Sequence, residues 1–260
     1  MPVAGHTERD RIDSYLICAT PRTGSSLLCG LLDSTGVAGH PESWFRREDR
    51  RMYAARWGVV NASDGGFAYA DYVRAAIAAG STANDVFAAR IMWGTLDEVV
   101  ANLARVYPDL ARSAIGLLTE AFGRTRFVYL RRGDVVAQAV SLLRAEQTNV
   151  WFETAQERRE PERQPLFGFD EVRERVGLIE EHNQAWQDWF DSVGIRPHLV
   201  LYEELDAAPV RVARGVIGFL GLDLPAGREI AVRHKRLADE LNAQWIETYR
   251  LQELEKRKRL

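Results

Sequence analysis

Four short segments of the chain are apolar and rich in Val, Ile, Tyr or Phe, a pattern typical of buried strands. They cover residues 14–20, 85–92, 126–131 and 197–202. The segments between them have helical periodicity, and we expect helices over about 24–35, 68–79, 95–106, 112–122, 134–147, 170–193, 208–220 and 239–257. Strands joined by long helical connections predict an α/β domain of three layers with a central parallel sheet.

The first predicted strand leads into a candidate anion-binding loop. Residues 14–32, SYLICATPRTGSSLLCGLL, form a strand, a turn and the start of a leucine-rich helix. The first backbone N–H groups of a helix, together with its dipole, favour an anion at that position. The loop adds a guanidinium, a flexible glycine and hydroxyl groups, supplied by Arg22, Thr23, Gly24, Ser25 and Ser26. In the simpler alternative, Thr23 or Ser25 only caps the helix.

This loop lacks the lysine that a Walker-type phosphate loop carries just after its second glycine. The lysines of the chain are Lys235, Lys256 and Lys258, all in its last quarter. A P-loop-like small-molecule kinase is therefore an alternative function that the loop disfavours.

The third predicted strand also runs into basic residues and then a helix. Residues 126–148 read RFVYLRRGDVVAQAVSLLRAEQT, with Arg132 at the strand end and Ser141 about two and a half turns into the helix. Both side chains could reach one phosphate if the loop folds back. In the alternative interpretation, Arg131 and Arg132 are solvated and Ser141 is buried against a neighbouring element.

Composition and charge narrow the range of partners. The chain has 260 residues, of which 46% are hydrophobic, enough for a substantial core. Its formal net charge of −3 gives no general attraction to nucleic acid or to an anionic membrane, so we expect neither as a partner. Any anion must instead be bound by a local cluster of charges.

The cysteines and the N-terminal residues indicate the cellular compartment in which we expect the protein. Cys18 and Cys29 lie in apolar stretches, so we expect buried thiols in a reducing compartment rather than a disulfide or a metal site. The first residues are polar, and no run approaches the roughly 20 apolar residues of a membrane span. These features predict a cytoplasmic protein with no transmembrane segment.

Four stretches of the sequence carry a family resemblance. They are YLICATPRTGSSLLCGLLDSTGVAGHPESWF (15–45), AARIMW (88–93), LRRGDVVAQAVSLLRAEQTNVW (130–151) and LADELNAQWIETYR (237–250). Through them the chain resembles the bacterial sulfotransferases that use 3′-phosphoadenosine 5′-phosphosulfate (PAPS), in particular the trehalose 2-sulfotransferase family. The resemblance implies a P-loop nucleotide-kinase-like sulfotransferase fold, with residues 1–260 as a single domain. It also implies transfer of a sulfuryl group from PAPS to a hydroxyl, which leaves 3′-phosphoadenosine 5′-phosphate (PAP).

The same resemblance implies roles for individual residues. The loop from Arg22 to Ser26 would hold the 5′-phosphosulfate, and Arg132 with Ser141 would bind the 3′-phosphate. Arg90 stands where we expect the family to have a donor-facing lysine, and arginine keeps that charge with a different geometry. PAPS needs no Mg²⁺ between its phosphates, so we expect no metal.

The general base for the acceptor hydroxyl is expected in GVAGHPESWF, residues 36–45. The family's glutamate aligns with Ser43, whereas this chain has Glu42 one residue earlier. We expect Glu42 to be the base, because an irregular loop can absorb a shift of one residue and serine cannot accept the proton. His40 is the second candidate.

The acceptor is defined only by class. The resemblance implies a carbohydrate or glycolipid such as trehalose, and lipid-linked sugars or small alcohols fit the same chemistry. We expect residues 46–80 and a mobile loop at about 153–167 to shape its pocket, and residues 1–12 to be flexible. Aromatic side chains proposed to stack on a ligand are Trp44, Phe45, Trp93 and Trp151.

Two further expectations concern assembly and activity. The resemblance implies a possible homodimer, to which the C-terminal helix could contribute. A noncatalytic nucleotide-binding protein is the remaining alternative, and it would need no base beside the loop.

Overall fold

The centre of the molecule is a sheet of parallel strands. The computed structural model describes residues 12–61, 66–151, 163–232 and 239–258, and within them the sheet has four strands in the order β2-β1-β3-β4. The strands are β1 (Ser14–Ala19), β2 (Phe87–Met92), β3 (Thr125–Arg131) and β4 (His198–Leu201). Ala19 pairs in register with Met92 on one side and Leu130 on the other, so the strands end at one common edge.

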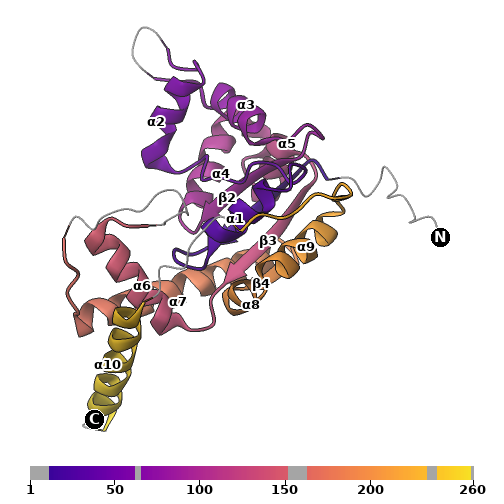
Figure 1. Cartoon of the computed structure of the whole chain (residues 1–260). Coiled ribbons are helices and arrows are strands. Elements are labelled where there is room, and N and C mark those ends of the chain that lie inside the picture. Colours follow the sequence, from indigo (N-terminus) through magenta and orange to yellow (C-terminus); the bar gives the residue numbers. More distant parts are fainter. Residues whose placement is uncertain (1–11, 62–65, 152–162, 233–238, 259–260) are drawn as a thin grey trace.

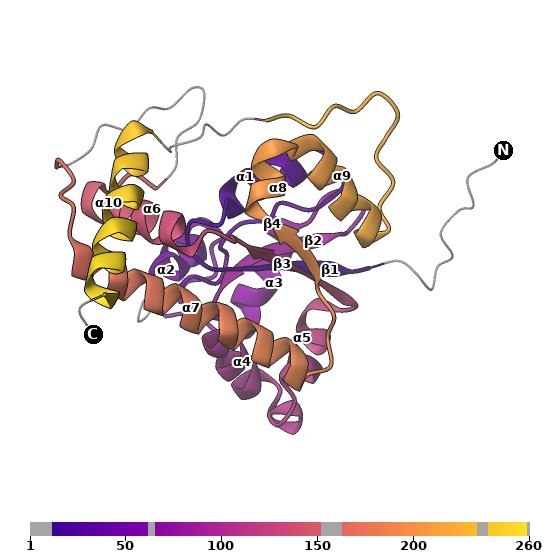
Figure 2. The same cartoon turned by 90° about the horizontal axis from the view of Figure 1, so that it is seen from below.

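Helices cover both faces of the sheet, because successive strand residues point to opposite sides. From β1, Leu16 and Cys18 pack on one face, and Tyr15 and Ile17 pack on the other. The first face is covered by α3 (Tyr69–Gly80), α4 (Thr95–Val106), α5 (Ala114–Phe122) and α7 (Phe169–Ser192). The second face is covered by α1 (Ser25–Asp33), α8 (Tyr202–Ala207) and α9 (Pro209–Leu220), as Figures 1 and 2 show.

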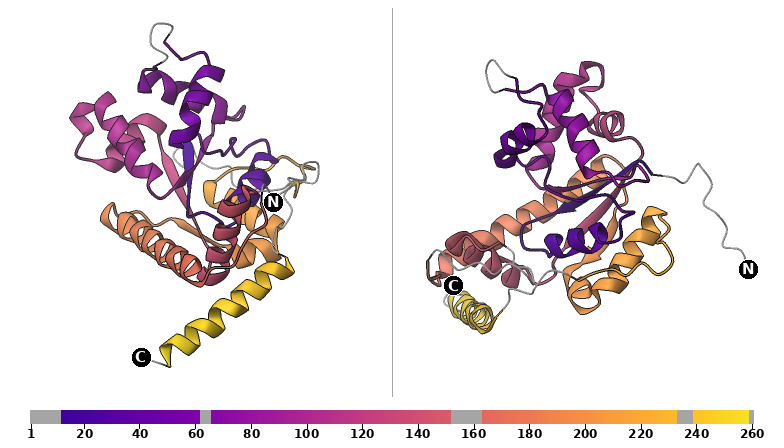
Figure 3. Two further views of the ribbon diagram at one scale, coloured as in Figure 1. Left: turned by 90° about the vertical axis from the view of Figure 1, so that its left-hand side faces the viewer. Right: turned by 45° about the horizontal axis from the view of Figure 1, so that its top comes forward.

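A third apolar cluster joins three helices beyond the edge of the sheet. It brings α6 (Val135–Thr148) and α7 together with α10 (Glu240–Arg257), whose buried Trp245 and Tyr249 face them. Ion pairs from Arg144 to Asp239 and from Arg250 to Asp134 tie α10 to α6. The end of α10 projects from the molecule in the left view of Figure 3.

The predicted three-layer α/β architecture with a central parallel sheet is confirmed, and every predicted strand and helix is found close to its expected bounds. Cys18 and Cys29 are buried free thiols, as expected. No helix in the described ranges is both long and apolar enough to cross a bilayer. The expectations for residues 1–11 and for residues 153–162 of the predicted mobile loop fall outside the described residues.

Two helices and one short turn were not predicted. They are α2 (Arg47–Arg56), α8, and the 3₁₀ turn η2 at Pro108–Leu110. The sequence of α2, REDRRMYAAR, has only Ala54 buried and so carries no apolar stripe. Helix α8 has six residues and follows β4 without a loop, so its sequence merges with that of the strand.

Candidate active site

The loop after β1 is braced from within and from α8. The hydroxyl of Thr23 is fully buried and donates to the Thr20 carbonyl at 2.9 Å, which leaves only its backbone for a ligand. Gly24 has φ of 82°, and a Cβ there would lie 2.7 Å from the Tyr202 ring, so glycine is required. No side chain caps α1, and the alternative in which Thr23 or Ser25 caps it is wrong. The first amides of α1 are therefore available to an anion.

Arg90 connects β2 to the start of α1. Its Nη1 donates to Ser26 Oγ at 2.9 Å and lies 3.5 Å from Ser25 Oγ, and its Nε donates to Ser43 Oγ at 2.9 Å. We call these four residues the Arg90 cluster. The cluster places a cation and hydroxyl groups at the N-terminal end of α1, where the helix dipole also favours negative charge.

Glu42 lies beside the Arg90 cluster. Its main chain forms a parallel bridge with Ala89, and its carbonyl accepts from the Arg90 N–H at 2.9 Å. The side chain of Glu42 is exposed. Burial raises the pKa of the nearby Tyr53, and the negative charge of Glu42 raises it further. Thus the backbone of Glu42 is fixed while its side chain is exposed to solvent.

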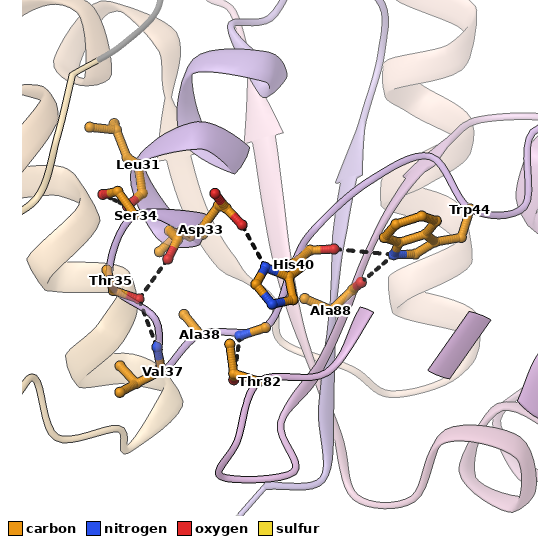
Figure 4. Close-up of polar contacts among 12 residues, drawn as sticks. Leu31, Asp33, Ser34, Thr35, Val37, Ala38, His40, Trp44, Thr82 and Ala88 are labelled. Carbon is orange, nitrogen blue, oxygen red and sulfur yellow. Dashed lines mark hydrogen bonds and ion pairs between the residues drawn. The ribbon is translucent and has the colours of Figure 1, made fainter. Parts of the chain in front are cut away.

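His40 lies at the other end of α1. Its Nδ1 and the Asp33 Oδ1 are 2.6 Å apart, and Figure 4 shows this pair beside the Trp44 indole, which donates to the carbonyls of His40 and Ala88. Ser25 and Asp33 bound the nine-residue helix α1, and a rise of 1.5 Å for each step from one end to the other separates its ends by about 12 Å. The structure therefore brings Glu42, and not His40, to the Arg90 cluster.

A second basic cluster forms between the loop and α6. Arg22 has φ of 68°, and its Nε donates to Ser141 Oγ at 3.0 Å. Arg132 Nη1 donates to the Arg22 carbonyl at 3.4 Å, and its guanidinium lies 4.4 Å from the centre of the Tyr202 ring. We call Arg22, Arg132 and Ser141 the Arg22 cluster. The Arg22 side chain thus lies with the residues expected at the 3′-phosphate and not with Ser25 and Ser26.

The Arg22 cluster carries concentrated positive charge. Burial, together with repulsion from Arg132 and Arg144, lowers the pKa of Arg22 to about 10, and the interaction with Tyr202 partly opposes this shift. Within the described part of the chain, Arg22 donates to neutral acceptors, namely Ser141 and the Trp151 carbonyl. A partly buried cation with neutral partners attracts an anion.

Glu203 already occupies the N-terminus of α6. Its carboxylate accepts from the Gly133 N–H at 3.0 Å and from the Asp134 N–H at 3.2 Å. The side chain of Asp134 caps the helix by accepting from Ala137. An anion at this second loop would therefore have to be held by side chains of the Arg22 cluster rather than by the amides of α6.

A sequence model of one protein family, the Stf0 sulphotransferases, matches residues 14–252. The chain belongs to this family. It is 28% identical to a trehalose 2-sulfotransferase of Mycobacterium tuberculosis over 260 residues, covering 91% of this chain and 94% of the relative. A trehalose 2-sulfotransferase of Mycolicibacterium smegmatis is 27% identical over 267 residues, with coverages of 93% and 96%.

Two solved structures are also similar to this Stf0 sulphotransferase. One is the sulfotransferase domain of the Synechococcus PCC 7002 olefin synthase, with 14% identity, a TM-score of 0.38 and coverages of 94% and 96%. The other is a sulfotransferase from Mycobacterium avium, with 15% identity, a TM-score of 0.43 and coverages of 93% and 69%.

The aromatic residues of this sulphotransferase lie mostly in the core. Phe45 is fully buried and Trp44 is 8% exposed, so the prediction that they stack on a ligand is wrong. Trp93 is partly buried against Trp186, and Trp151 is 39% exposed. Only Trp151 among the four is largely accessible, and it adjoins Arg22 through its carbonyl. No group of three or more potential metal ligands occurs among the described residues.

Sequence reasoning missed one residue that shapes the loop of this Stf0 sulphotransferase. Gln138 is fully buried, and its Nε2 donates to the Pro21 carbonyl at 2.6 Å and to Thr20 Oγ1 at 2.9 Å. It lies three residues before Ser141, and therefore on the same face of α6. This spacing was the signal that could have identified it.

Proposed function

We propose that this protein transfers a sulfuryl group from PAPS to a hydroxyl of a carbohydrate or glycolipid acceptor. The Arg90 cluster and the Arg22 cluster support this proposal, because both adjoin one short loop and each offers at least one guanidinium and one serine hydroxyl. PAPS carries a phosphosulfate on the 5′ carbon of its ribose and a phosphate on the 3′ carbon. A donor with two anionic groups fits two such clusters.

The observation that carries the proposal is the hydrogen bond from Arg22 to Ser141. It joins the anion loop to α6, beside Arg132, and creates a basic site that a mononucleotide 5′-phosphate alone would leave unused. We assign Arg132, Ser141 and the Arg22 side chain to the 3′-phosphate. The amides and hydroxyls of Gly24, Ser25 and Ser26, together with the amide of Thr23 and with Arg90, would hold the 5′-phosphosulfate.

The proposed reaction is an in-line displacement at sulfur. The acceptor oxygen forms a bond to sulfur while the bond between sulfur and the bridging oxygen of the 5′-phosphate breaks. That oxygen leaves with the electron pair and becomes part of PAP, so negative charge grows on the 5′-phosphate. Arg90 and the first amides of α1 would stabilise this charge, and no metal is needed.

Glu42 is the proposed general base. Its carboxylate is exposed beside the Arg90 cluster, so it can receive the proton of an acceptor hydroxyl that approaches the sulfur. His40 is less suited, because it is engaged with Asp33 at the far end of α1. A positioned base contributes on the order of 10² to 10⁴ in rate.

The relatives support the choice of acceptor class. Both are trehalose 2-sulfotransferases, so we propose a trehalose-like sugar as the first acceptor to test. The proposal places the enzyme in the cytoplasm, with a small-molecule or glycan acceptor, no nucleic-acid partner, and a homodimer as the possible assembly.

A thermal-shift series tests the donor. PAP at about 100 times its Kd should stabilise the protein by about 2.7 kcal/mol, which for a chain of this length raises Tm by about 5–10 °C. Adenosine 5′-phosphosulfate, which lacks the 3′-phosphate, should have a much smaller effect. Stabilisation by ATP with Mg²⁺ and not by PAP would instead indicate a kinase.

A transfer assay tests the reaction. The enzyme is incubated with ³⁵S-labelled PAPS and trehalose, then with a panel of other disaccharides, glycolipid head groups and small alcohols. We expect label in a sugar product. Binding of PAP with no transfer to any member of the panel would favour a noncatalytic nucleotide-binding protein.

A further inference from the structure

The guanidinium of Arg90 is held from two sides. Its Nε donates to Ser43 Oγ at 2.9 Å, and its Nη1 donates to Ser26 Oγ at the same distance. Because a guanidinium is planar and its N–H groups form a rigid fork, two bonds in different directions fix its orientation. Ser43 and Ser26 belong to separate segments. Arg90 therefore joins α1 to the strip beside β2, by which we mean residues 40–44.

Ser43 is itself held in place by the residues on either side. The Glu42 carbonyl accepts from the Arg90 N–H, and the Trp44 indole donates to the Ala88 carbonyl at 3.0 Å. The Trp44 carbonyl accepts from the buried Tyr72 hydroxyl. The backbone at Ser43 is therefore attached to β2 and α3, and its hydroxyl has little freedom to leave Arg90.

We propose that Ser43 is a positioning residue that aims Arg90 at the leaving group of the transfer reaction. Electrostatic stabilisation of a transition state depends on charges that are oriented before the reaction begins. With Nε bonded to Ser43, Arg90 presents Nη1 to Ser26, and the Ser26 oxygen accepts that bond. The Ser26 proton is then free to be donated to an oxygen of the 5′-phosphosulfate. This inference rests on the proposed function.

Ser43 acts through Arg90 and not on the acceptor. A hydroxyl that accepts from a guanidinium has little tendency to accept a proton from a second hydroxyl, so the proton transfer stays with Glu42. The effect of Ser43 should therefore appear in turnover much more than in donor binding.

Kinetics of four variants test this role. Ser43→Ala should lower kcat by about tenfold with less than a threefold change in the KM for PAPS, and Ser43→Thr, which keeps the hydroxyl, should restore most of the rate. Arg90→Ala should lower kcat by about 10² to 10³, and adding Ser43→Ala to it should cause no further loss. Ser192→Ala removes a hydroxyl that donates to the Trp189 carbonyl on α7 and is the matched control, with wild-type rates expected.

Arginine side-chain NMR gives a readout that does not depend on turnover. The Nε–H signal of Arg90, assigned by its absence in Arg90→Lys, should be protected from exchange in the wild type and in Ser43→Thr, and should exchange rapidly in Ser43→Ala. If the wild type is active and Ser43→Ala has the same kcat and the same Nε–H protection as the wild type, this inference alone is overturned. A wild type that neither binds PAP nor transfers sulfate overturns the proposed function and this inference together.

Discussion

Arg22 and Ser141 are 119 residues apart in the sequence, and the Nε of one donates to the hydroxyl of the other at 3.0 Å. This contact makes the anion loop and α6 into one basic site. Its geometry depends on the left-handed backbone conformation of Arg22, which residues other than glycine rarely adopt. The local strain and the partly buried charge support our proposal that this region binds the donor.

Substitution of two neighbouring arginines, Arg131 at the end of β3 and Arg132 directly after it, should distinguish a specific binding role from a general effect of charge. Arg132→Ala should raise the Kd for PAP by about 10- to 100-fold, because it removes charge-assisted hydrogen bonds, and should leave binding of adenosine 5′-phosphosulfate nearly unchanged. Arg131→Ala removes the same charge from an exposed position. It should change neither the Kd for PAP nor the Kd for adenosine 5′-phosphosulfate by more than about twofold. Isothermal titration calorimetry measures both. An equal loss of PAP affinity in the two variants would contradict the assignment of Arg132 to the 3′-phosphate.

The partly buried charge of Arg22 should lower the stability of the protein when no ligand is bound. Burial and the repulsion from Arg132 lower its pKa, so the protein holds a cation in an unfavourable environment at pH 7. Arg22→Gln should raise the free energy of unfolding of the free protein by about 1 kcal/mol, and the increase in stability on adding PAP should shrink sharply. Urea unfolding with and without PAP tests this. A less stable free protein would show that the hydrogen bonds of Arg22 outweigh its desolvation.

Gln138 should influence the donor through the loop backbone. Gln138→Leu keeps the side chain buried but removes the bonds to the Pro21 carbonyl and to Thr20, so the loop can relax. We expect the Kd for PAP to rise about tenfold. Gln184→Leu, at an exposed position of α7, is the control and should bind PAP normally. Wild-type PAP affinity in Gln138→Leu would assign Gln138 to the core alone.

The pH dependence of stability should reveal the tie between α6 and α10. The hydrogen bond from Arg144 lowers the pKa of Asp239, so the carboxylate stabilises the folded state above about pH 4 and this contribution is lost as the pH falls through the folded pKa. Asp239 is half exposed, so the contribution is under about 1 kcal/mol. Asp239→Asn should therefore be less stable than the wild type at pH 7, with a difference that narrows at pH 3. Thermal unfolding at both pH values measures it, with Asp109→Asn as an exposed control; a constant difference would contradict the linkage.

The elements of the fold were predictable wherever burial leaves a pattern. Helix α6 follows from its apolar positions, whereas α2 has one buried residue and so leaves no periodic signal. The arrangement of the basic side chains in the structure differs from the one expected from the sequence. Arg132 and Ser141 were paired from the sequence, but Arg22 was placed with Ser25 and Ser26, because its direction depends on a single positive φ that composition does not reveal.

The hydrogen bond between Ser43 and Arg90 could not be predicted from the sequence, for a different reason. It exists because residues 40–44 lie along the outer edge of β2, and that placement depends on long-range contacts such as the Trp44 indole on the Ala88 carbonyl. The same strip places the two candidate bases at different distances from the Arg90 cluster. It carries the Glu42 main chain to Ala89 and leaves His40 beside Asp33, a difference that two residues of sequence separation cannot show.

Comparison of Glu42 with His40 should identify the general base. Glu42→Gln keeps the size and polarity of the side chain and removes its basicity, so kcat should fall by about 10² to 10⁴ while the Kd for PAP stays within about threefold. His40→Asn should keep most of the activity, because His40 lies at the far end of α1. Single-turnover transfer of ³⁵S-labelled sulfate to the acceptor found in the screen measures the chemical step in each variant. A large loss in His40→Asn with a normal rate in Glu42→Gln would move the base to His40 and require that residues 36–45 rearrange when the acceptor binds.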